Sequence, residues 1–211
     1  MNVLAIGGHY DDIELGAGGS IARHIDEGDN VYMVVITDSG YTSADGVEIR
    51  SPETAEKEGR AAAKALGLRL NNLTCFGYKA KEVKYNANLI EKLDKIISDK
   101  KIDLVYTHWI GDVHQDHSAI GRATLNAARH TPRVLMYRSN WYKSIEAYDA
   151  NFFVDITDYL DIKVASIRAH ESECSRRGEK WVTFVKNQNR TRGIEIGVEY
   201  AEDFKLVKWL V

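Results

Sequence analysis

The sequence has few prolines, few cysteines and no long apolar run. Its 211 residues include two prolines and two cysteines. Because Cys75 and Cys174 lie far apart and form no Cys-x-x-Cys pair, neither a disulfide framework nor a thiolate zinc site is predicted, and we interpret both as inert reduced thiols. No stretch approaches the ~20 apolar residues that a membrane-spanning helix needs, so we expect no membrane insertion.

An excess of charge of one sign is also lacking. The chain has 28 Lys and Arg against 31 Asp and Glu, a formal net charge of −3, which predicts no nucleic-acid partner. Residues 1–12 have no basic segment before their apolar run, and glycines and charges break that run too early for a signal peptide, so we expect a cytoplasmic protein. Without linker, repeat or proline-rich boundary, residues 1–211 are interpreted as one domain.

Apolar runs alternate with helical patterns along most of the chain. Residues 30–37, "NVYMVVIT", are typical of a strand buried on both faces. Ser51 and Pro52 open a helical pattern as N-cap and first helical residue, and Gly67 follows its end. By the same criteria, strands are predicted at residues 2–8, 73–77, 102–108, 133–139 and 152–156, and helices at residues 14–28, 86–101, 117–130 and 157–173.

Strands separated by helices of this length predict an α/β fold with a mostly parallel sheet covered on both faces. Right-handed crossovers then determine most of the topology. After about residue 176 the pattern weakens, and residues 200–211 fit a final strand or a short helix equally well.

Two groups of polar residues follow two of the predicted strands. His9, Asp11 and Asp12 come after the first strand, and residues 108–117 supply His108, Asp112, His114, Asp116 and His117 after another. Because ligands bind outside the carboxyl ends of parallel strands, we expect both groups at one edge of the sheet. Imidazole and carboxylate suit zinc, iron and their neighbours, and three such ligands leave a position open for water, as in catalytic zinc sites.

Other interpretations of these residues stay open at this point. The first group could cap a helix, since aspartates at a helix start satisfy free backbone donors. Residues 7–19 could form a phosphate-binding glycine loop, although they lack the G-x-G-x-x-G pattern and their carboxylates would repel phosphate. His114, Asp116 and His117 could belong to a solvated loop.

The same residues resemble a known family. Residues 8–22, "GHYDDIELGAGGSIA", are similar to the His-Pro-Asp-Asp signature of the LmbE-like, or PIG-L, family of zinc-dependent N-deacetylases. Residues 107–124, "THWIGDVHQDHSAIGRAT", resemble its His-x-Asp-His motif. The resemblance covers nearly the whole chain and implies a Rossmann-like, three-layer α/β sandwich with its site at the carboxyl ends of the strands.

The resemblance also implies roles for single residues. One departure is Tyr10, where the family usually has proline; since proline is not a ligand, only the rigidity of the loop is in question. Residues 170–173, "HESE", depart from the family's usual Ser-Gln ending. The implied roles are zinc ligand for His9, Asp12 and His117, general base for Asp11, and imidazole and carboxylate beside the metal for His114 and Asp116.

Amide hydrolysis would use each of these residue types. A divalent ion held by two imidazoles and a carboxylate keeps a net positive charge and can lower the pKa of bound water from ~16 toward ~7. Asp11 can take the proton of that water and pass it to the leaving amine. A protonated His114, held by Asp116, would help to stabilise the oxyanion.

The hypothesis from the resemblance is a zinc-dependent hydrolase that removes an acyl group, expected to be acetyl, from an amino sugar or its glycoconjugate. Spacing alone supports only metal-assisted hydrolysis, and iron(II) or cobalt(II) would suit the ligands nearly as well as zinc. The resemblance also implies a homo-oligomer. The alternatives are a sugar- or nucleotide-binding protein without turnover, and a metal site that is only structural.

The remaining polar and aromatic residues near these motifs have two interpretations each. Arg50 could bind a sugar hydroxyl or phosphate, or be solvated. Asp38 could support the site or cap a turn. His108 is expected to pack at the strand end rather than to act as a fourth ligand, and Asp112 borders the site. Trp141, like Trp109 and Tyr142, could stack on a sugar ring or belong to the core or rim.

Overall fold

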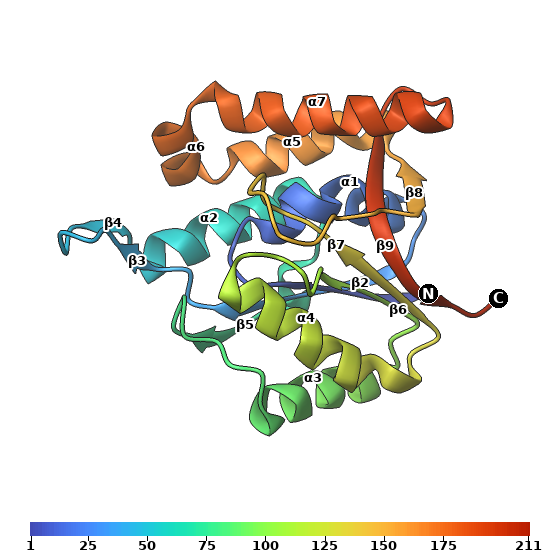
Figure 1. Cartoon of the computed structure of the whole chain (residues 1–211), viewed down its shortest axis with the longest axis horizontal. Helices are drawn as coiled ribbons and strands as arrows, with labels where there is room; N and C mark the ends of the chain where they lie inside the picture. Colours follow the sequence, from blue (N-terminus) through green and yellow to red (C-terminus); the bar gives the residue numbers. More distant parts are fainter.

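A computed structural model describes all 211 residues and shows a seven-stranded sheet between layers of helices (Figure 1). Its strands are β1 (Asn2–Gly7), β2 (Asn30–Thr37), β5 (Leu73–Tyr78), β6 (Leu104–His108), β7 (Arg133–Tyr137), β8 (Phe152–Asp155) and β9 (Ala201–Trp209). They lie in the order β5-β2-β1-β6-β7-β9-β8, and the first five are parallel, whereas β9 is antiparallel to both β7 and β8. The predicted α/β sandwich with a mostly parallel sheet is confirmed.

Helices cover both faces of this sheet. They are α1 (Asp12–Asp26), α2 (Pro52–Ala65), α3 (Ala87–Asp99), α4 (Gln115–Ala127), α5 (Leu160–Arg168), α6 (Glu171–Arg177) and α7 (Glu179–Ile196). One face packs on α1 and α2 and the other on α3 and α4, while α5, α6 and α7 form a further layer outside α1 and α2 (Figure 1). No helix has both the length and the apolarity to span a bilayer.

The central strand β1 shows why the strands read as unbroken apolar runs. Val3 and Ala5 belong to the core beneath α1 and α2, and Leu4 and Ile6 to the core beneath α3 and α4. All four are fully buried. Since successive strand residues point to opposite faces, a strand buried on both sides must be apolar at every position.

The predicted start and end of α2 are confirmed, but two other segments differ from the prediction. Ser51 Oγ accepts the Thr54 N–H at 3.1 Å, and Gly67 adopts φ +87° after the helix. Residues 157–173 form a helix broken between α5 and α6, because the buried His170 leaves helical geometry and places Nδ1 3.1 Å from Arg50. Residues 200–211, left undecided above, contain β9, and the polar loop before α2 contains a hairpin of β3 (Tyr41–Thr42) and β4 (Glu48–Arg50).

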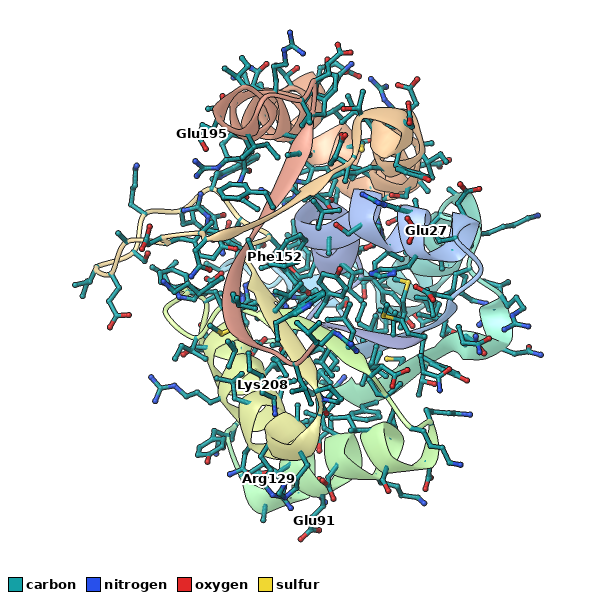
Figure 2. All side chains as sticks on the ribbon, turned by 90° about the vertical axis from the view of Figure 1, so that its right-hand side faces the viewer. Glu27, Glu91, Arg129, Phe152, Glu195 and Lys208 are labelled. Carbon is teal, nitrogen blue, oxygen red and sulfur yellow. The ribbon has the colours of Figure 1, made fainter.

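Strand β9 is tied to the rest of the molecule by buried polar contacts. Glu202 accepts hydrogen bonds from the Gly19 N–H at 2.9 Å and the Ser20 N–H at 2.7 Å, and it pairs with Lys163 Nζ at 2.6 Å. A buried charged pair of this kind is tolerated only when its remaining hydrogen-bonding groups are satisfied. At the other end of β9, the Lys208 ammonium group donates to the Arg129 carbonyl just after α4 (Figure 2).

The order of the strands determines where a site can form. From β1 the chain continues to β2 and β5 on one side, and it later enters β6 and β7 on the other. The carboxyl ends of β1 and β6 therefore lie side by side with the connections leaving in opposite directions. Open α/β sheets bind their ligands at such a switch point.

Candidate active site

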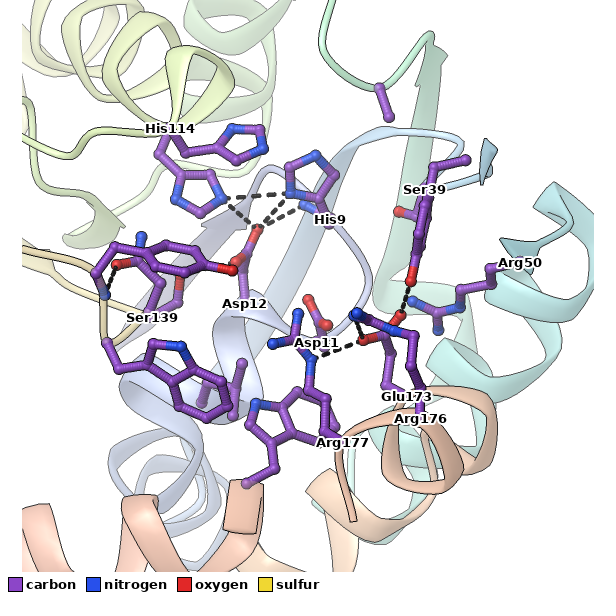
Figure 3. A pocket seen from close by; sticks show the side chains of 18 of the residues that line it. His9, Asp11, Asp12, Ser39, Arg50, His114, Ser139, Glu173, Arg176 and Arg177 are labelled. Carbon is purple, nitrogen blue, oxygen red and sulfur yellow. Dashed lines mark hydrogen bonds and ion pairs between the residues drawn. The ribbon is translucent and has the colours of Figure 1, made fainter. Parts of the chain in front are cut away.

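A cavity of about 280 Å³ opens at the carboxyl ends of β1 and β6 (Figure 3). Its walls come from the loop between β1 and α1, the start of α4, the loop after β7, the hairpin region and α6. Both predicted motifs contribute, through His9, Asp11, Asp12, His114 and His117. The expectation that the two motifs meet at one edge of the sheet is confirmed.

His9, Asp12 and His117 point one donor atom each toward a common centre. His9 Nδ1 lies 3.2 Å from Asp12 Oδ2, and His117 Nε2 lies 3.3 Å from each of these two atoms. An ion bound tetrahedrally at ~2.0–2.1 Å from each ligand would hold its ligands ~3.3–3.4 Å apart. The triangle of two imidazole nitrogens and one carboxylate oxygen therefore fits a divalent metal in both geometry and chemistry.

A carboxylate holds the outer ring nitrogen of each histidine in this triangle. His9 Nε2 lies 3.1 Å from Asp116 Oδ2, and His117 Nδ1 lies 3.2 Å from Asp112 Oδ2. Asn140 Nδ2 donates to both oxygens of Asp112, at 2.8 and 2.7 Å. An outer carboxylate of this kind places the proton on the outer nitrogen and leaves the inner nitrogen with a free lone pair, which is the form that a metal requires.

Asp12 is fixed from two sides at the first position of α1. Its Oδ2 accepts the His9 N–H at 2.7 Å, and its Oδ1 accepts the hydroxyl of Ser139 at 2.7 Å. Because both oxygens are oriented by donors and the side chain is 4% exposed, the position of this carboxylate is set before any ligand binds.

His108 is the strand-end packing residue that we expected. Its ring is fully buried and stacks on His117 with centroids 3.9 Å apart. Its Nε2 accepts the Gly8 N–H at 2.8 Å, so the lone pair that could have served as a fourth ligand is already used.

The cluster stabilises positive charge at its centre. Burial lowers the pKa of His9, but hydrogen bonds to Asp116 and Asp12 outweigh it and raise the pKa to about 9. Burial also lowers the pKa of His117, but the carboxylates of Asp12 and Asp112 outweigh it and raise the pKa to about 10. Surroundings that favour a protonated imidazole at this point favour a bound cation for the same electrostatic reason.

The predicted pairing of His114 with the Asp116 carboxylate is wrong. His114 Nδ1 instead accepts the backbone N–H of Asp116 at 3.2 Å. The Asp116 carboxylate is occupied by His9, by the Lys81 N–H at 2.6 Å and by the Val83 N–H at 3.1 Å. Burial and the neighbouring histidines lower the pKa of His114 to about 4. This lowered pKa favours a neutral ring for His114 over the protonated ring that we expected, and the hydrogen bond at Nδ1 leaves the ring proton on Nε2.

Asp11 lies beside the metal-binding triangle without belonging to it. It precedes α1, but its side chain makes no capping hydrogen bond, which contradicts the helix-cap interpretation for this residue. Its φ of 135° is rare for a residue other than glycine and turns the carboxylate toward the cavity. Burial, together with the charge of Asp12, raises the pKa of Asp11 to about 7.

Tyr10, which replaces the family's usual proline, is held by packing and hydrogen bonds. Its ring is 4% exposed and lies against Gly59 of α2, where any Cβ would overlap it. Its N–H donates to Ser39 Oγ at 2.9 Å, and its carbonyl accepts from Arg50 Nη1 at 3.1 Å. Packing thus replaces the rigidity that a proline would supply to this loop.

Arg50 and Asp38 each bind neighbouring residues of the protein. Arg50 is 4% exposed and pairs with Glu58 at 2.9 Å, so the solvated interpretation is wrong; the residue lines the cavity, and substrate binding by it stays a prediction. Asp38 accepts the Gly40 N–H and pairs with Lys79, which is the turn-capping interpretation.

Several residues of the cavity were missed in the sequence. Ser139 and Asn140 follow β7 at the same edge, so the rule that located the two motifs could have found them. Trp141 and Tyr142 do line the cavity, whereas Trp109 is buried elsewhere. Glu173 ends the segment "HESE" that departs from the family's pattern, which was a signal in the sequence. The residues without any such signal are Tyr41, Lys81, Arg176, Arg177 and Trp181.

Comparisons with known proteins show the family of this chain. The family PIG-L, described as GlcNAc-PI de-N-acetylase, matches residues 4–128. "Uncharacterized deacetylase YaiS" of Escherichia coli (strain K12) is 34% identical over 178 residues, which cover 81% of this chain and 90% of that protein. Diacetylchitobiose deacetylase of Thermococcus kodakarensis is 26% identical over 223 residues, covering 97% and 82%. The structure of N,N'-diacetylchitobiose deacetylase from Pyrococcus horikoshii superposes with a TM-score of 0.84 at 25% identity, over 98% of this chain and 83% of that one.

Proposed function

The chain belongs to the PIG-L family, and on this premise we propose that it is a metal-dependent hydrolase that removes an acetyl group from the nitrogen of an amino sugar or its glycoconjugate. The observation that carries the proposal is the triangle of His9, Asp12 and His117, with the carboxylate of Asp11 beside it. The deacetylase names of the relatives, two of them diacetylchitobiose deacetylases, support the reaction and the substrate class.

His9, Asp12 and His117 would hold the ion, for which we propose zinc. When bound, such an ion polarises the acyl carbonyl and lowers the pKa of a water molecule. The outer carboxylates keep both imidazoles in the tautomer that can bind it, and Ser139 keeps Asp12 oriented.

Asp11 acts as the general base. It takes one proton from the attacking water, whose oxygen forms a bond to the acyl carbon. When the carbon–nitrogen bond breaks, the same carboxyl group returns the proton to the leaving nitrogen, so that the products are a free amine and acetic acid, which then ionises to acetate. Its position one residue before a ligand, on the cavity wall and without a capping hydrogen bond, leaves its oxygens available for both transfers.

His114 stabilises the oxyanion that develops on the acyl oxygen. Because Nδ1 accepts a backbone N–H, the neutral ring keeps its proton on Nε2 and can donate it as a hydrogen bond. The backbone fixes this donor in advance, which avoids reorganisation during the reaction. Loss of such a donor typically lowers the rate by ~10²- to 10³-fold.

We carry three further proposals forward with this function. Residues 1–211 act as one domain, since β9 packs against both α7 and the parallel part of the sheet. The protein works in the cytoplasm, and it acts as a homo-oligomer, which is what the resemblance implies.

The test combines metal content with release of free amine from N-acetylated sugars, for the wild type and for Asp11→Asn. We expect close to one metal per chain in both proteins, amine release that chelation abolishes, and a loss of at least ~10³-fold in kcat for Asp11→Asn. Asp38→Asn is the matched control, because Asp38 lies at the same edge of the sheet but pairs with Lys79 outside the cavity. Metal-independent binding that survives Asp11→Asn, without turnover, would replace the hydrolase with a sugar-binding protein.

A further inference from the structure

Three charged residues of α6 line the cavity on the side of Asp11 that faces away from the histidines. Figure 3 shows Glu173, Arg176 and Arg177 on one side of Asp11 and the histidine cluster on the other. The mechanism proposed above uses none of these three side chains. They belong to the same cavity, so whatever occupies it while its amide lies at Asp11 extends toward them.

This end of the cavity carries an excess of positive charge. Glu173 accepts from Arg176 Nη2 at 2.5 Å, from Arg177 Nε at 2.9 Å and from the Tyr41 hydroxyl at 2.7 Å. Glu173 is the only carboxylate that forms an ion pair with either arginine. Asp11 acts on Arg177 through its charge but makes no ion pair with it, so the two guanidinium groups share one paired carboxylate, and Lys81 adds a further positive charge at the cavity wall.

The position of the Arg177 guanidinium is fixed by rings as well as by Glu173. Its central carbon lies 5.2 Å from the centroid of Trp141 and 5.5 Å from that of Trp181. Arg176 lies over the ring of Tyr41 at 5.6 Å. The side chain of Arg177 is 24% exposed and that of Arg176 is 42% exposed. Both cations are thus held in place by aromatic contacts and remain accessible from the cavity.

We propose that Arg176 and Arg177, together called the arginine pair, bind an anionic group of the substrate, a carboxylate or a phosphate, remote from its acetylated nitrogen. This inference rests on the proposed function and specifies its substrate as an anionic amino-sugar conjugate. Arg177 uses Nε for Glu173, so its terminal nitrogens have no carboxylate partner, and a planar guanidinium matches the two oxygens of a carboxylate or phosphate. A neutral sugar would leave the excess charge uncompensated in a partly desolvated site.

The experiment compares kcat/KM of the metal-loaded protein for three conjugates of N-acetylglucosamine that differ only at the anomeric oxygen. The methyl glycoside is neutral, the 1-phosphate carries a phosphate, and the carboxymethyl glycoside carries a carboxylate. We expect at least one anionic substrate to exceed the methyl glycoside by about 10-fold or more, with a KM that rises with ionic strength. The preferred anion identifies which of the two groups the site accepts.

Substitution then tests the assignment to the arginine pair. Arg177→Gln should lower the ratio of anionic to neutral kcat/KM by about 10- to 100-fold, mainly through KM, and Arg177→Lys should restore only part of it. Arg176→Gln, at the more exposed position, gives the same test if Arg177→Gln does not fold. Arg168→Gln is the control: this arginine pairs with Glu179 on the outer surface, so the ratio should not change.

The outcomes separate the two proposals. Equal kcat/KM for neutral and anionic sugars, or an anion preference that survives in Arg177→Gln and Arg176→Gln, overturns the anion site and leaves the hydrolase intact. If none of the three sugars releases amine while metal is bound, the proposed function fails and the anion site falls with it.

Discussion

The cavity has a histidine end and an arginine end, and they are built from different parts of the fold. At the histidine end, the side chains follow the central strands β1 and β6 or start the helices after them. At the arginine end, they come from α6, from the hairpin region and from the loop after β7, and of these only the loop follows a strand of the main sheet. The part that performs the reaction is thus tied to the central strands, whereas most of the part that meets the rest of the substrate is not.

Exposure differs between the two ends in the same sense. Asp12 and His117 are each 4% exposed and are hydrogen-bonded on both sides, whereas Arg176 is 42% exposed and Tyr142 is 49% exposed. A substitution at the buried end leaves polar groups without hydrogen bonds, which is costly. After a substitution at the exposed end, water can hydrogen-bond to the groups that lose their partner. Substitutions at the histidine end should therefore affect every substrate alike, and those at the arginine end should change which substrate is preferred.

The largest expected effect is that of His117→Gln. This change removes one corner of the metal-binding triangle, so we expect metal to be lost and kcat to fall by about 10³-fold or more for neutral and anionic sugars alike. Elemental analysis and amine release measure both effects. His130→Gln, at an exposed position after α4, should change neither. A substrate-dependent loss in His117→Gln would break the division between the two ends.

A smaller effect is expected for Asp112→Asn. The amide cannot hold His117 Nδ1–H as a carboxylate does, so metal affinity should fall by about 10- to 100-fold. Titration with a competing chelator measures the affinity. Activity should return at saturating metal, because the ligands themselves are intact. Activity that stays low with the site fully loaded would assign Asp112 to the reaction itself rather than to metal binding.

Gly59→Ala tests whether packing keeps the first motif in place. A Cβ at Gly59 would overlap the ring of Tyr10, so we expect overpacking to cost about 1–3 kcal/mol of unfolding free energy and to weaken metal binding by His9. Chemical denaturation measures the cost. In a Tyr10→Ala background the ring is absent, and Gly59→Ala should then cost much less. Additive costs would show that the two residues do not constrain one another.

The smallest expected effect is the loss of the contribution of Glu173 to stability at low pH. Burial raises its pKa, but hydrogen bonds from Tyr41, Arg177 and Arg176 outweigh this and lower the pKa from 4.5 to about 2. Because the pKa is lower in the folded state, the contribution of Glu173 to stability is complete above pH 4.5 and is lost as the pH falls toward 2. Between pH 4.5 and pH 2, the free energy of unfolding of the wild type should fall by about 1–2 kcal/mol more than that of Glu173→Gln, measured by denaturation at each pH. Parallel pH profiles would contradict this.

The parallel part of the sheet was predictable because its strands are buried on both faces and its helices have clear caps. The C-terminal part was less so. The apolar residues of α7 gather in its first turns, around Trp181 and Val185, and a polar stretch separates them from the exposed Ile194 and Ile196 at its end, so no helical period emerges. Strand β9 was ambiguous because its identity depends on pairing with β7 and β8, which no local pattern records.

The same distinction holds for the site. The residues of the metal-binding triangle follow strands, so their neighbourhood can be deduced from the order of elements. The hydrogen-bond partners of Asp116 could not be deduced in this way. Which donor a carboxylate binds depends on differences in position smaller than the distance between neighbouring residues. Arg177 and Trp141 meet only because α6 turns away from α5 at His170, a break that local helix propensity does not predict.

Glu202 has a consequence for the time course of folding. It joins β9 to Gly19 and Ser20 of α1, a separation of 183 and 182 residues. Contacts between such distant positions form slowly, because a long loop must close, at a cost in entropy, before the contacts can stabilise the chain. On the ribosome, the helix that begins with Asp12 has to wait for residue 202 to emerge before its last buried partners arrive. The metal-binding loop is thus made early in synthesis, but its helix is locked in place only when nearly the whole chain has been translated.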